Sequence, residues 1–339
     1  MSEYLVLVAP SSNRVYADAA PRLAAAEIET VLAAFGSTPD VAPIDLAGVD
    51  YLTISASGDE VVPALSNLSA TFALFEREGE LLRPIPLQRR QFYPSDLVTI
   101  QKYQGKTNEQ WTRLLLNVTA AATKRPSKWL DGGLDVMDPM CGRGTTLNIA
   151  LLAGYSVTGV DVDRKDYDTY AAFLKTWVQA HRLKHTMDRG ASTTGGRARG
   201  REFTLEVAPT KDAFKTGDTQ TVRYLSTDTT DLGGLVRAAS IDVIVTDTPY
   251  GVQHGSHGDR LSRRPLELLD RAMPAWIRTL RTGGTVGLSY NRHVAPAENL
   301  ALMLEQHGLI VVTDWRDSPF RHRVDASIDR DLIVARKES

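Results

Sequence analysis

The sequence predicts an α/β protein whose larger part is a doubly wound, mostly parallel sheet. Three observations predict this class. Apolar runs typical of buried strands alternate with helical stretches from about residue 131 onward. Several of these runs lead directly into an aspartate and a loop, the arrangement that places ligands at the carboxyl edge of such a sheet. The apolar fraction of 42% over 339 residues is enough for a sizeable core.

We divide the chain into three regions. Residues 1–85 read as a small N-terminal α/β domain, with a split βαβ order that indicates a ferredoxin-like arrangement. Its expected helices and strands are strand 4–9, helix 21–35, strand 51–55, helix 61–68 and strand 70–76. Residues 86–130 form a connector, which we expect to be extended over 91–99 and helical over 108–123.

Residues 131–339 are the larger domain, with a Rossmann-like alternation of strands and helices. We expect its strands at 134–138, 156–161, 222–226, 241–246, 285–289, 310–314 and 331–335. The Gly- and Arg-rich stretch 188–201 has no apolar period, so it is predicted to be a flexible insertion.

Charge is distributed unevenly along the chain. Residues 1–80 hold twelve acidic and three basic residues, whereas residues 81–130 hold two acidic and nine basic ones. A basic strip can follow the phosphates of a nucleic acid, and an ordinary solvated surface is an equally good interpretation of this feature alone. The cations expected at phosphates are Arg89, Arg90, Lys102 and Lys106.

The sequence contains no long apolar run and one cysteine, Cys141. A membrane span is therefore not expected, and neither is an intrachain disulfide. Both observations fit a cytoplasmic protein. The oligomeric state is not indicated.

The most informative stretch is Leu-Asp-Val-Met-Asp-Pro-Met-Cys-Gly-Arg-Gly-Thr-Thr-Leu at 134–147, where a strand, a Gly-containing loop and a helix start follow one another. A dinucleotide fold is the competing interpretation, but its third glycine position is occupied by Leu147. A carboxylate beside the loop repels a pyrophosphate and favours the two cationic groups of S-adenosylmethionine. The expected cofactor residues here are Asp138, Pro139, Cys141, Gly142, Gly144 and Thr145.

Two further acids are candidates for the cofactor. Asp161 ends the second strand, where a carboxylate can accept hydrogen bonds from both ribose hydroxyls, and Asp163 is a nearby alternative. A helix N-cap is the structural alternative for this place. Asp228 follows the third strand and is a candidate for the adenine amino group, with an Asx turn as its alternative.

The candidate catalytic residues are Asp247, Thr248, Pro249 and Tyr250, which follow the buried run 241–246. An aromatic amino group is a poor nucleophile because its lone pair is delocalised into the ring. The Asp247 carboxylate and the Thr248 carbonyl can accept its two N–H bonds and so direct the lone pair towards the methyl carbon. Pro249 fixes the backbone, and Tyr250 can stack on an extracted base.

These motifs resemble the THUMP-associated tRNA guanosine-N2 methyltransferases of archaea and eukaryotes. Their loop reads D-P-M-C-G-S-G-T and their tetrapeptide D-P-P-Y-G, against Asp-Pro-Met-Cys-Gly-Arg-Gly-Thr at 138–145 and Asp-Thr-Pro-Tyr-Gly at 247–251. The segments 320–334 and 23–29 are also similar. The resemblance implies a class I methyltransferase domain that uses S-adenosylmethionine and methylates guanine N2 in structured RNA such as tRNA. Thr248 departs from the pattern, and the region before the catalytic domain is short for a THUMP module.

Other functions stay open. An adenine-N6 or cytosine-N4 DNA methyltransferase uses the same tetrapeptide but usually carries a sizeable target-recognition segment. A methyltransferase of other amines, or a module that binds without turnover, is also compatible with parts of the sequence. His254 and His257 are too few ligands for a metal site, so no metal is expected.

Overall fold

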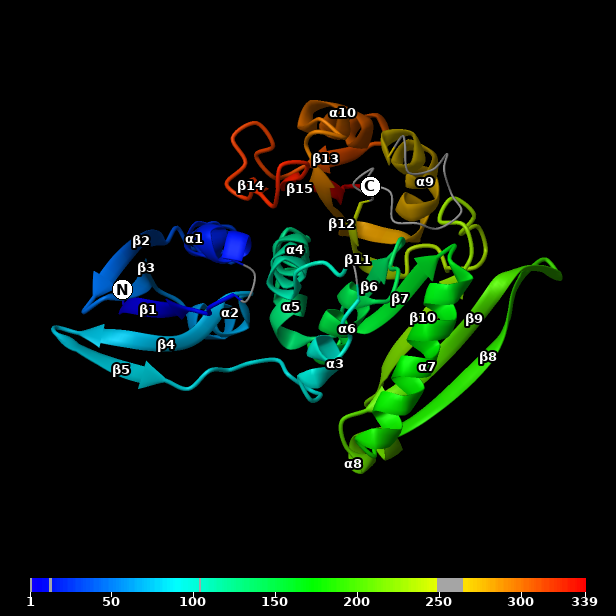
Figure 1. The fold of residues 1–339 in the computed structure, drawn as a ribbon, viewed down its shortest axis with the longest axis horizontal. Helices are drawn as coiled ribbons and strands as arrows, with labels where there is room; N and C mark the ends of the chain where they lie inside the picture. The colour runs from blue at the N-terminus through cyan, green and yellow to red at the C-terminus, as the bar shows by residue number, and fades with distance from the viewer. Residues whose placement is uncertain (1, 12–13, 104, 249–264) are drawn as a thin grey trace.

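The structure is a computed structural model that describes residues 2–11, 14–103, 105–248 and 265–339. The strands in this part of the chain form two separate sheets. Figure 1 shows the smaller and the larger sheet on opposite sides of helices α4 (Glu109–Ala121) and α5 (Ser127–Asp131). None of the described helices is long and apolar enough to cross a membrane.

The N-terminal unit is an antiparallel sheet with two helices packed against it. Its strand order is β2-β3-β1-β4-β5, and the elements follow one another as β-α-β-β-α-β with one further strand. They are β1 (Ser2–Val8), α1 (Arg14–Ala34), β2 (Asp40–Leu46), β3 (Val49–Ala56), α2 (Val61–Asn67), β4 (Thr71–Glu78) and β5 (Leu81–Ile85).

This unit differs from the expectation at its helix start and at both sheet edges. α1 begins seven residues before Pro21, because Tyr16 and Ala20 continue its buried face and their packing offsets the hydrogen bond that the proline lacks. Strands β2 and β5 were not predicted. They contain Pro43 and Pro84, which a sheet tolerates only at edges such as these.

The connector is more helical than expected. Asp96–Thr99 forms a short helix, α3, within the stretch predicted to be extended. The predicted helix over 108–123 is confirmed as α4, and the Asn108 side chain caps it by accepting from the backbone N–H of Trp111. Because α4 is buried along most of its length, it is a core element rather than a linker.

The larger sheet has the order β13-β15-β12-β11-β6-β7-β10-β9-β8, with β14 (His322–Arg323) paired to β15. The neighbours from β12 to β10 run parallel, and β15 runs antiparallel to β12. All seven predicted strands are confirmed, β7 (Ser156–Asp161) with the predicted ends and the others with shifted ends. The others are β6 (Asp135–Asp138), β10 (Gln220–Ser226), β11 (Ile241–Asp247), β12 (Leu280–Asn291), β13 (Leu309–Val311) and β15 (Asp329–Lys337).

Helices cover both faces of this sheet. Two hydrophobic clusters result, and the one containing α4, α6 and α7 residues is continuous with the core of the N-terminal unit. The helices are α6 (Thr145–Leu152), α7 (Arg164–Ala180), α8 (Lys211–Thr216), α9 (Pro265–Thr279) and α10 (Ala297–Gln306). The doubly wound parallel architecture is therefore confirmed.

The prediction of a flexible insertion over 188–201 is wrong. This stretch belongs to a β-hairpin made of β8 (Lys184–Thr194) and β9 (Arg197–Ala208). Gly195 and Gly196 form its two-residue turn, and both have positive φ, 57° and 75°. A Gly-Gly pair between two strands is a local signal for such a turn.

The N-terminal unit is joined to the catalytic part through buried polar contacts. Glu27 on α1 is fully buried and accepts a 2.8 Å hydrogen bond from Nδ2 of Asn117 on α4. It also accepts from the backbone N–H and the hydroxyl of Ser69. Arg22 donates to the carbonyl oxygens of Pro319 and Arg321 near the C-terminus. These contacts fix α1 against both α4 and the C-terminal segment.

Candidate active site

The candidate site lies at the carboxyl edge of the larger sheet. Parallel pairing aligns Asp138 of β6 with Gly159 of β7, and Asp247 of β11 with Ser289 of β12. β11 is the neighbour of β6 on the other side. The predicted cofactor loop and the predicted catalytic aspartate therefore start from adjacent strands, as the sequence indicated.

The glycine loop after β6 has a conformation that only its glycines readily adopt. Gly142 has φ 48° and Gly144 has φ 77°. A Cβ on Gly144 would approach the ring of Tyr170 to 2.5 Å, so the loop packs tightly on that side. A Cβ on Gly142 would meet only Asp166 Oδ2, at 3.8 Å. The loop is thus close-packed at Gly144 and open at Gly142.

Asp161 holds this loop from the end of β7. Its Oδ2 accepts a 2.8 Å hydrogen bond from the Gly142 backbone N–H, and its Oδ1 accepts from the Asp163 N–H at 2.9 Å. Burial raises the pKa of the Asp161 carboxyl. Asp163 instead caps α7 by accepting from the backbone N–H of Lys165. Asp161 therefore holds the glycine loop, whereas Asp163 is the N-cap of α7.

Asp138 is buried beneath the loop, with 3% of its surface exposed. Its Oδ1 accepts from the Thr246 hydroxyl at 2.8 Å and from the Met140 backbone N–H at 3.1 Å. Burial raises the pKa of this carboxyl to about 7. Asp138 therefore ties β6 to β11, and its contact with a cofactor stays a prediction.

The loop is also held by the connector and by β10, whose Tyr224 hydroxyl donates to the Gly142 carbonyl oxygen at 2.7 Å. The Thr145 hydroxyl is hydrogen-bonded to the hydroxyl of Tyr103 at 2.8 Å. Cys141 is a buried free thiol whose pKa is raised by burial. Pro139 lies in the turn between β6 and the loop glycines. Tyr103 could not be recognised from the sequence, because 42 residues separate it from its partner Thr145.

Asp228 forms the Asx turn that was the alternative to its cofactor role. Its Oδ1 accepts from both the backbone N–H and the hydroxyl of Thr230, at 2.8 and 2.7 Å. It follows β10 at the same sheet edge as Asp161. The turn explains its position without a ligand, and contact with adenine stays a prediction.

The start of the tetrapeptide is fixed by two anchors. Oδ2 of Asp247 accepts a 2.6 Å hydrogen bond from the Thr107 hydroxyl. Thr248 is buried, and both its backbone N–H and its hydroxyl donate to the carbonyl oxygen of Ser289 at 2.9 Å. The Ser289 hydroxyl in turn accepts from the indole N–H of Trp111 on α4. Thr248 thus secures the backbone at the place where the resembling family has proline.

Several predicted residues lie outside the described residues: Pro249, Tyr250, His254 and His257. Within the described ranges, no group of three or more His, Cys, Asp or Glu side chains could hold a metal ion.

The model of one protein family, described as RMKL-like methyltransferase domain, matches residues 115–286. The matched range contains the glycine loop, the Asp247 strand and 172 of the 339 residues. The chain belongs to this methyltransferase family. The family includes the THUMP-associated RNA methyltransferases. No curated protein matches the chain significantly.

Several solved structures are similar to this methyltransferase at low identity. N-methyltransferase NodS from Bradyrhizobium japonicum WM9 is 14% identical with a TM-score of 0.40, over 68% of this chain and 96% of NodS. SMU.1697c from Streptococcus mutans, in complex with SAH, is 11% identical with a TM-score of 0.37, over 60% and 89%. An rRNA methylase from Streptococcus thermophilus is 11% identical with a TM-score of 0.35, over 70% and 100%.

The methyltransferase has a class I, Rossmann-like catalytic domain and uses S-adenosylmethionine as its methyl donor. The residues at the sheet edge fit this cofactor. Gly142 leaves one side of the loop open, and the carboxylate of Asp161 beside it can accept hydrogen bonds from the hydroxyls of a ligand. A carboxylate has about four acceptor positions, so Asp161 can hold the loop and still accept a hydroxyl.

The basic connector of the methyltransferase does not present the expected strip of cations. Arg90 donates to two backbone carbonyl oxygens, at 2.8 and 3.2 Å, and Arg89 to another at 2.5 Å. Lys106 donates to two carbonyl oxygens and pairs with Glu109. Lys102 and Arg89 are both exposed, but Arg89 is bonded to a backbone carbonyl oxygen of the protein. Three of the four cations therefore make contacts within the protein, and their contact with phosphates stays a prediction.

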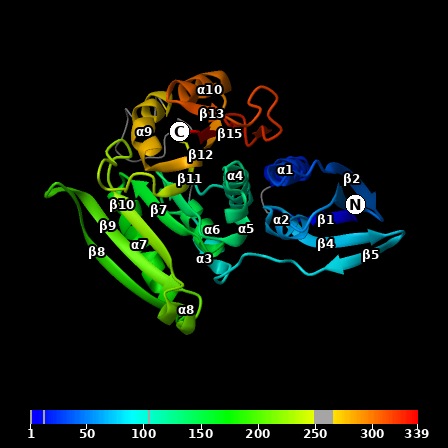
Figure 2. The same cartoon turned by 180° about the vertical axis from the view of Figure 1, so that it is seen from behind.

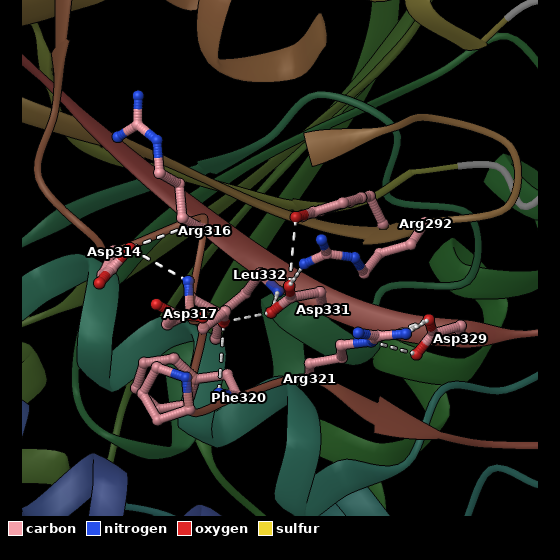
Figure 3. Close-up of polar contacts among 12 residues, drawn as sticks. Arg292, Asp314, Arg316, Asp317, Phe320, Arg321, Asp329, Asp331 and Leu332 are labelled. Atoms are coloured by element: carbon pink, nitrogen blue, oxygen red, sulfur yellow. Dashed lines mark hydrogen bonds and ion pairs between the residues drawn. The ribbon is translucent and has the colours of Figure 1, made fainter. Parts of the chain in front are cut away.

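The C-terminal segment of the methyltransferase fixes β12 from the other side. Figure 3 shows Asp331 of β15 receiving hydrogen bonds from Arg292, at 2.8 Å, and from the Leu332 backbone N–H. The side chain of Asp331 is fully buried, and burial raises its pKa. Arg321 and Asp329 form a second pair in the same view. This network holds the strand that carries the anchor for Thr248.

Proposed function

We propose that this methyltransferase transfers a methyl group to an exocyclic amino group of a nucleic-acid base, with guanine N2 in tRNA or another structured RNA as the favoured target. The observation that carries the proposal is the position of Asp247. Its carboxylate stands at the end of β11, beside the glycine loop of β6, and is held there by Thr107. Such a fixed acceptor is what an unreactive aromatic amine requires.

Asp247 and Thr248 would act on the amino group together. The Asp247 carboxylate accepts one N–H bond and the Thr248 backbone carbonyl accepts the other, so that the nitrogen lone pair points at the methyl group. Because the hydroxyl and N–H of Thr248 are bonded to Ser289, its carbonyl has a fixed position. Pro249 and Tyr250 complete the proposed site from the sequence, with Tyr250 stacking on the base.

On this proposal, Gly142, Gly144 and Asp161 form the main cofactor contacts. S-adenosylmethionine supplies a methyl group that its sulfonium has already activated. Asp161 would accept the ribose hydroxyls, and the open side of Gly142 would admit the ligand to the loop backbone. Asp138, Pro139, Cys141, Thr145 and Asp228 are second candidates along the same edge.

RNA is favoured over DNA for two reasons. The loop and the tetrapeptide resemble those of the guanosine-N2 enzymes, and the family includes RNA methyltransferases.

We infer that the N-terminal unit is a ferredoxin-like domain. It has the β-α-β-β-α-β element order and the β2-β3-β1-β4 strand order of such a domain.

The test uses the purified protein with labelled S-adenosylmethionine and three separate substrates: total tRNA, ribosomal RNA and DNA. Digestion to nucleosides and mass spectrometry then identify the product. We expect N2-methylguanosine from RNA and no label in DNA. Methyladenine or N4-methylcytosine from DNA would establish the DNA alternative instead. In parallel, RNA from a strain that lacks the protein should have lost one methylated guanosine.

A further inference from the structure

The outer end of the β8–β9 hairpin concentrates positive charge. The thirteen residues from Arg189 to Arg201 contain four arginines and no acidic residue, although the whole chain has a net charge of −2. All four are exposed: Arg189, Arg197, Arg199 and Arg201. The hairpin is an ordered structure, so these charges have defined positions.

The strand register distributes these arginines around the end of the hairpin. Arg189 is the partner of Phe203, and Arg201 lies two residues from Phe203 on the same strand, so Arg189 and Arg201 share a face. The register then skips Arg199, which has no Cα partner on β8. A bulge of this kind redirects side chains. Arg197 lies next to the turn.

The hairpin carries these arginines to the edge of the active site. Arg201 is paired with Ser226, the last residue of β10, and Ser226 is aligned with Asp161. The four preceding residues of β9 extend the hairpin about 13 Å further in the same direction. A Cβ on Gly200 would stand 2.1 Å from the Ser226 carbonyl oxygen, so the hairpin is closely apposed to the end of β10. Figures 1 and 2 show the hairpin at the outer side of the larger sheet, away from the N-terminal unit.

The present ion pairs of these arginines are exposed to solvent. Arg199 pairs with Asp231 at 3.1 Å, and Arg201 pairs with Asp168 at 2.8 Å. The side chains of these two arginines and two aspartates are 43–53% exposed. The exposed one-point pair of Arg199 contributes little, so a phosphate can replace Asp231 there. Arg201 holds Asp168 through two hydrogen bonds and is the stronger pair, but a phosphate offers it the same two-point geometry. In the described part of the chain, Arg189 and Arg197 have no ion pair.

We propose that the outer end of the β8–β9 hairpin is the docking arm for the phosphate backbone of the RNA. This inference rests on the proposed function, and it replaces the connector as the docking surface. In the order β11-β6-β7-β10-β9, the hairpin stands four strand spacings from Asp247, about 19 Å. The arm would therefore hold RNA several nucleotides away from the methylated base, while the cofactor loop lies between them.

The test compares two quadruple variants of the full chain. R189Q/R197Q/R199Q/R201Q removes the arm's charge, and K175Q/K184Q/K211Q/K215Q removes the same charge from exposed lysines towards the α8 end. Affinity for tRNA is measured against salt concentration. We expect the slope of log affinity against log salt to fall by up to about four for the first variant and to stay unchanged for the second. At saturating RNA, kcat should be retained, while the RNA KM rises; affinity for S-adenosylmethionine should not change.

A variant with only two substitutions controls for a folding defect in the quadruple variant. R189Q/R197Q leaves both ion pairs intact and should give about half of the slope change. Parallel slopes for the wild type and both arm variants would overturn the proposal. So would a change in oligomeric state with unaltered RNA affinity, since it would assign the open edge of β8 to a second copy of the chain. If the wild type methylates no RNA, the proposed function itself fails, which is a separate result.

Discussion

The hydroxyl of Thr107 donates a 2.6 Å hydrogen bond to Oδ2 of Asp247, from a position 140 residues earlier in the chain. Thr107 immediately precedes Asn108, the N-cap of α4. The helix that joins the N-terminal unit to the catalytic domain thus begins at the candidate catalytic carboxylate. Thr107 is a positioning residue, because it orients the group that would contact the substrate.

Replacement of Thr107 should impair transfer without affecting the cofactor. A hydrogen bond to a charged group contributes about 1.5–3 kcal/mol, so T107V should lower kcat about ten- to a hundredfold. T107S keeps the hydroxyl and should restore most of the activity. Steady-state kinetics with saturating RNA gives kcat, and calorimetry gives the affinity for S-adenosylmethionine. Equal kcat for T107V and the wild type would remove the positioning role.

Asp247 itself should be indispensable for transfer. D247A removes one of the two proposed acceptors for the amino N–H bonds, so we expect turnover to be abolished. Because Asp247 is proposed to meet the base, affinity for S-adenosylmethionine should stay within a few-fold. Single-turnover transfer and calorimetry measure the two quantities separately. Near-normal turnover would show that the amino group is activated elsewhere.

Substitutions of Asp161 and Asp163 should have different effects, the first on cofactor binding and the second on the capping of α7. D161A should weaken the binding of S-adenosylmethionine by about 1–3 kcal/mol, because charged hydrogen bonds to the ribose are lost. It also releases the Gly142 N–H, which should loosen the loop. D163A is the matched control: it removes the N-cap of α7 and should cost about 1 kcal/mol of unfolding free energy with affinity unchanged. The reverse pattern would make Asp163 the ribose ligand.

The buried Glu27, which joins α1 to Asn117 of α4, should make the free energy of unfolding depend on pH. Burial raises the pKa of Glu27 from 4.5 to about 7. Between these values the folded state retains a proton that the unfolded state has released. The free energy of unfolding should therefore fall as the pH rises from about 4.5 to 7, by up to about 3 kcal/mol from this residue.

Chemical denaturation at several pH values checks this expectation. E27Q cannot titrate, so its unfolding free energy should fall less over the same range. E29Q is the matched control, since Glu29 lies on the same helix and is exposed; it should follow the wild type. If E27Q and the wild type have the same pH dependence, Glu27 is charged throughout and its buried contacts fully stabilise the carboxylate.

The sequence alone determined those features that depend on residues close to one another in the chain. The α/β class and seven of the ten strands described in the larger sheet followed from apolar runs and their spacing. The glycine loop was predictable because strand, aspartate and glycines are contiguous over 134–147. The β8–β9 hairpin could also have been found, since Gly195 and Gly196 are a local turn signal between two strands.

Only the tertiary structure decided which polar side chains meet. Thr107 approaches Asp247, and Glu27 approaches Asn117, because separate elements pack against α4. The same packing turned Arg90 of the connector towards backbone carbonyls, where the sequence suggested phosphates. A run of basic residues fixes the charge of a segment, but burial and the nearest acceptor decide what that charge binds, and both depend on residues far away in the chain.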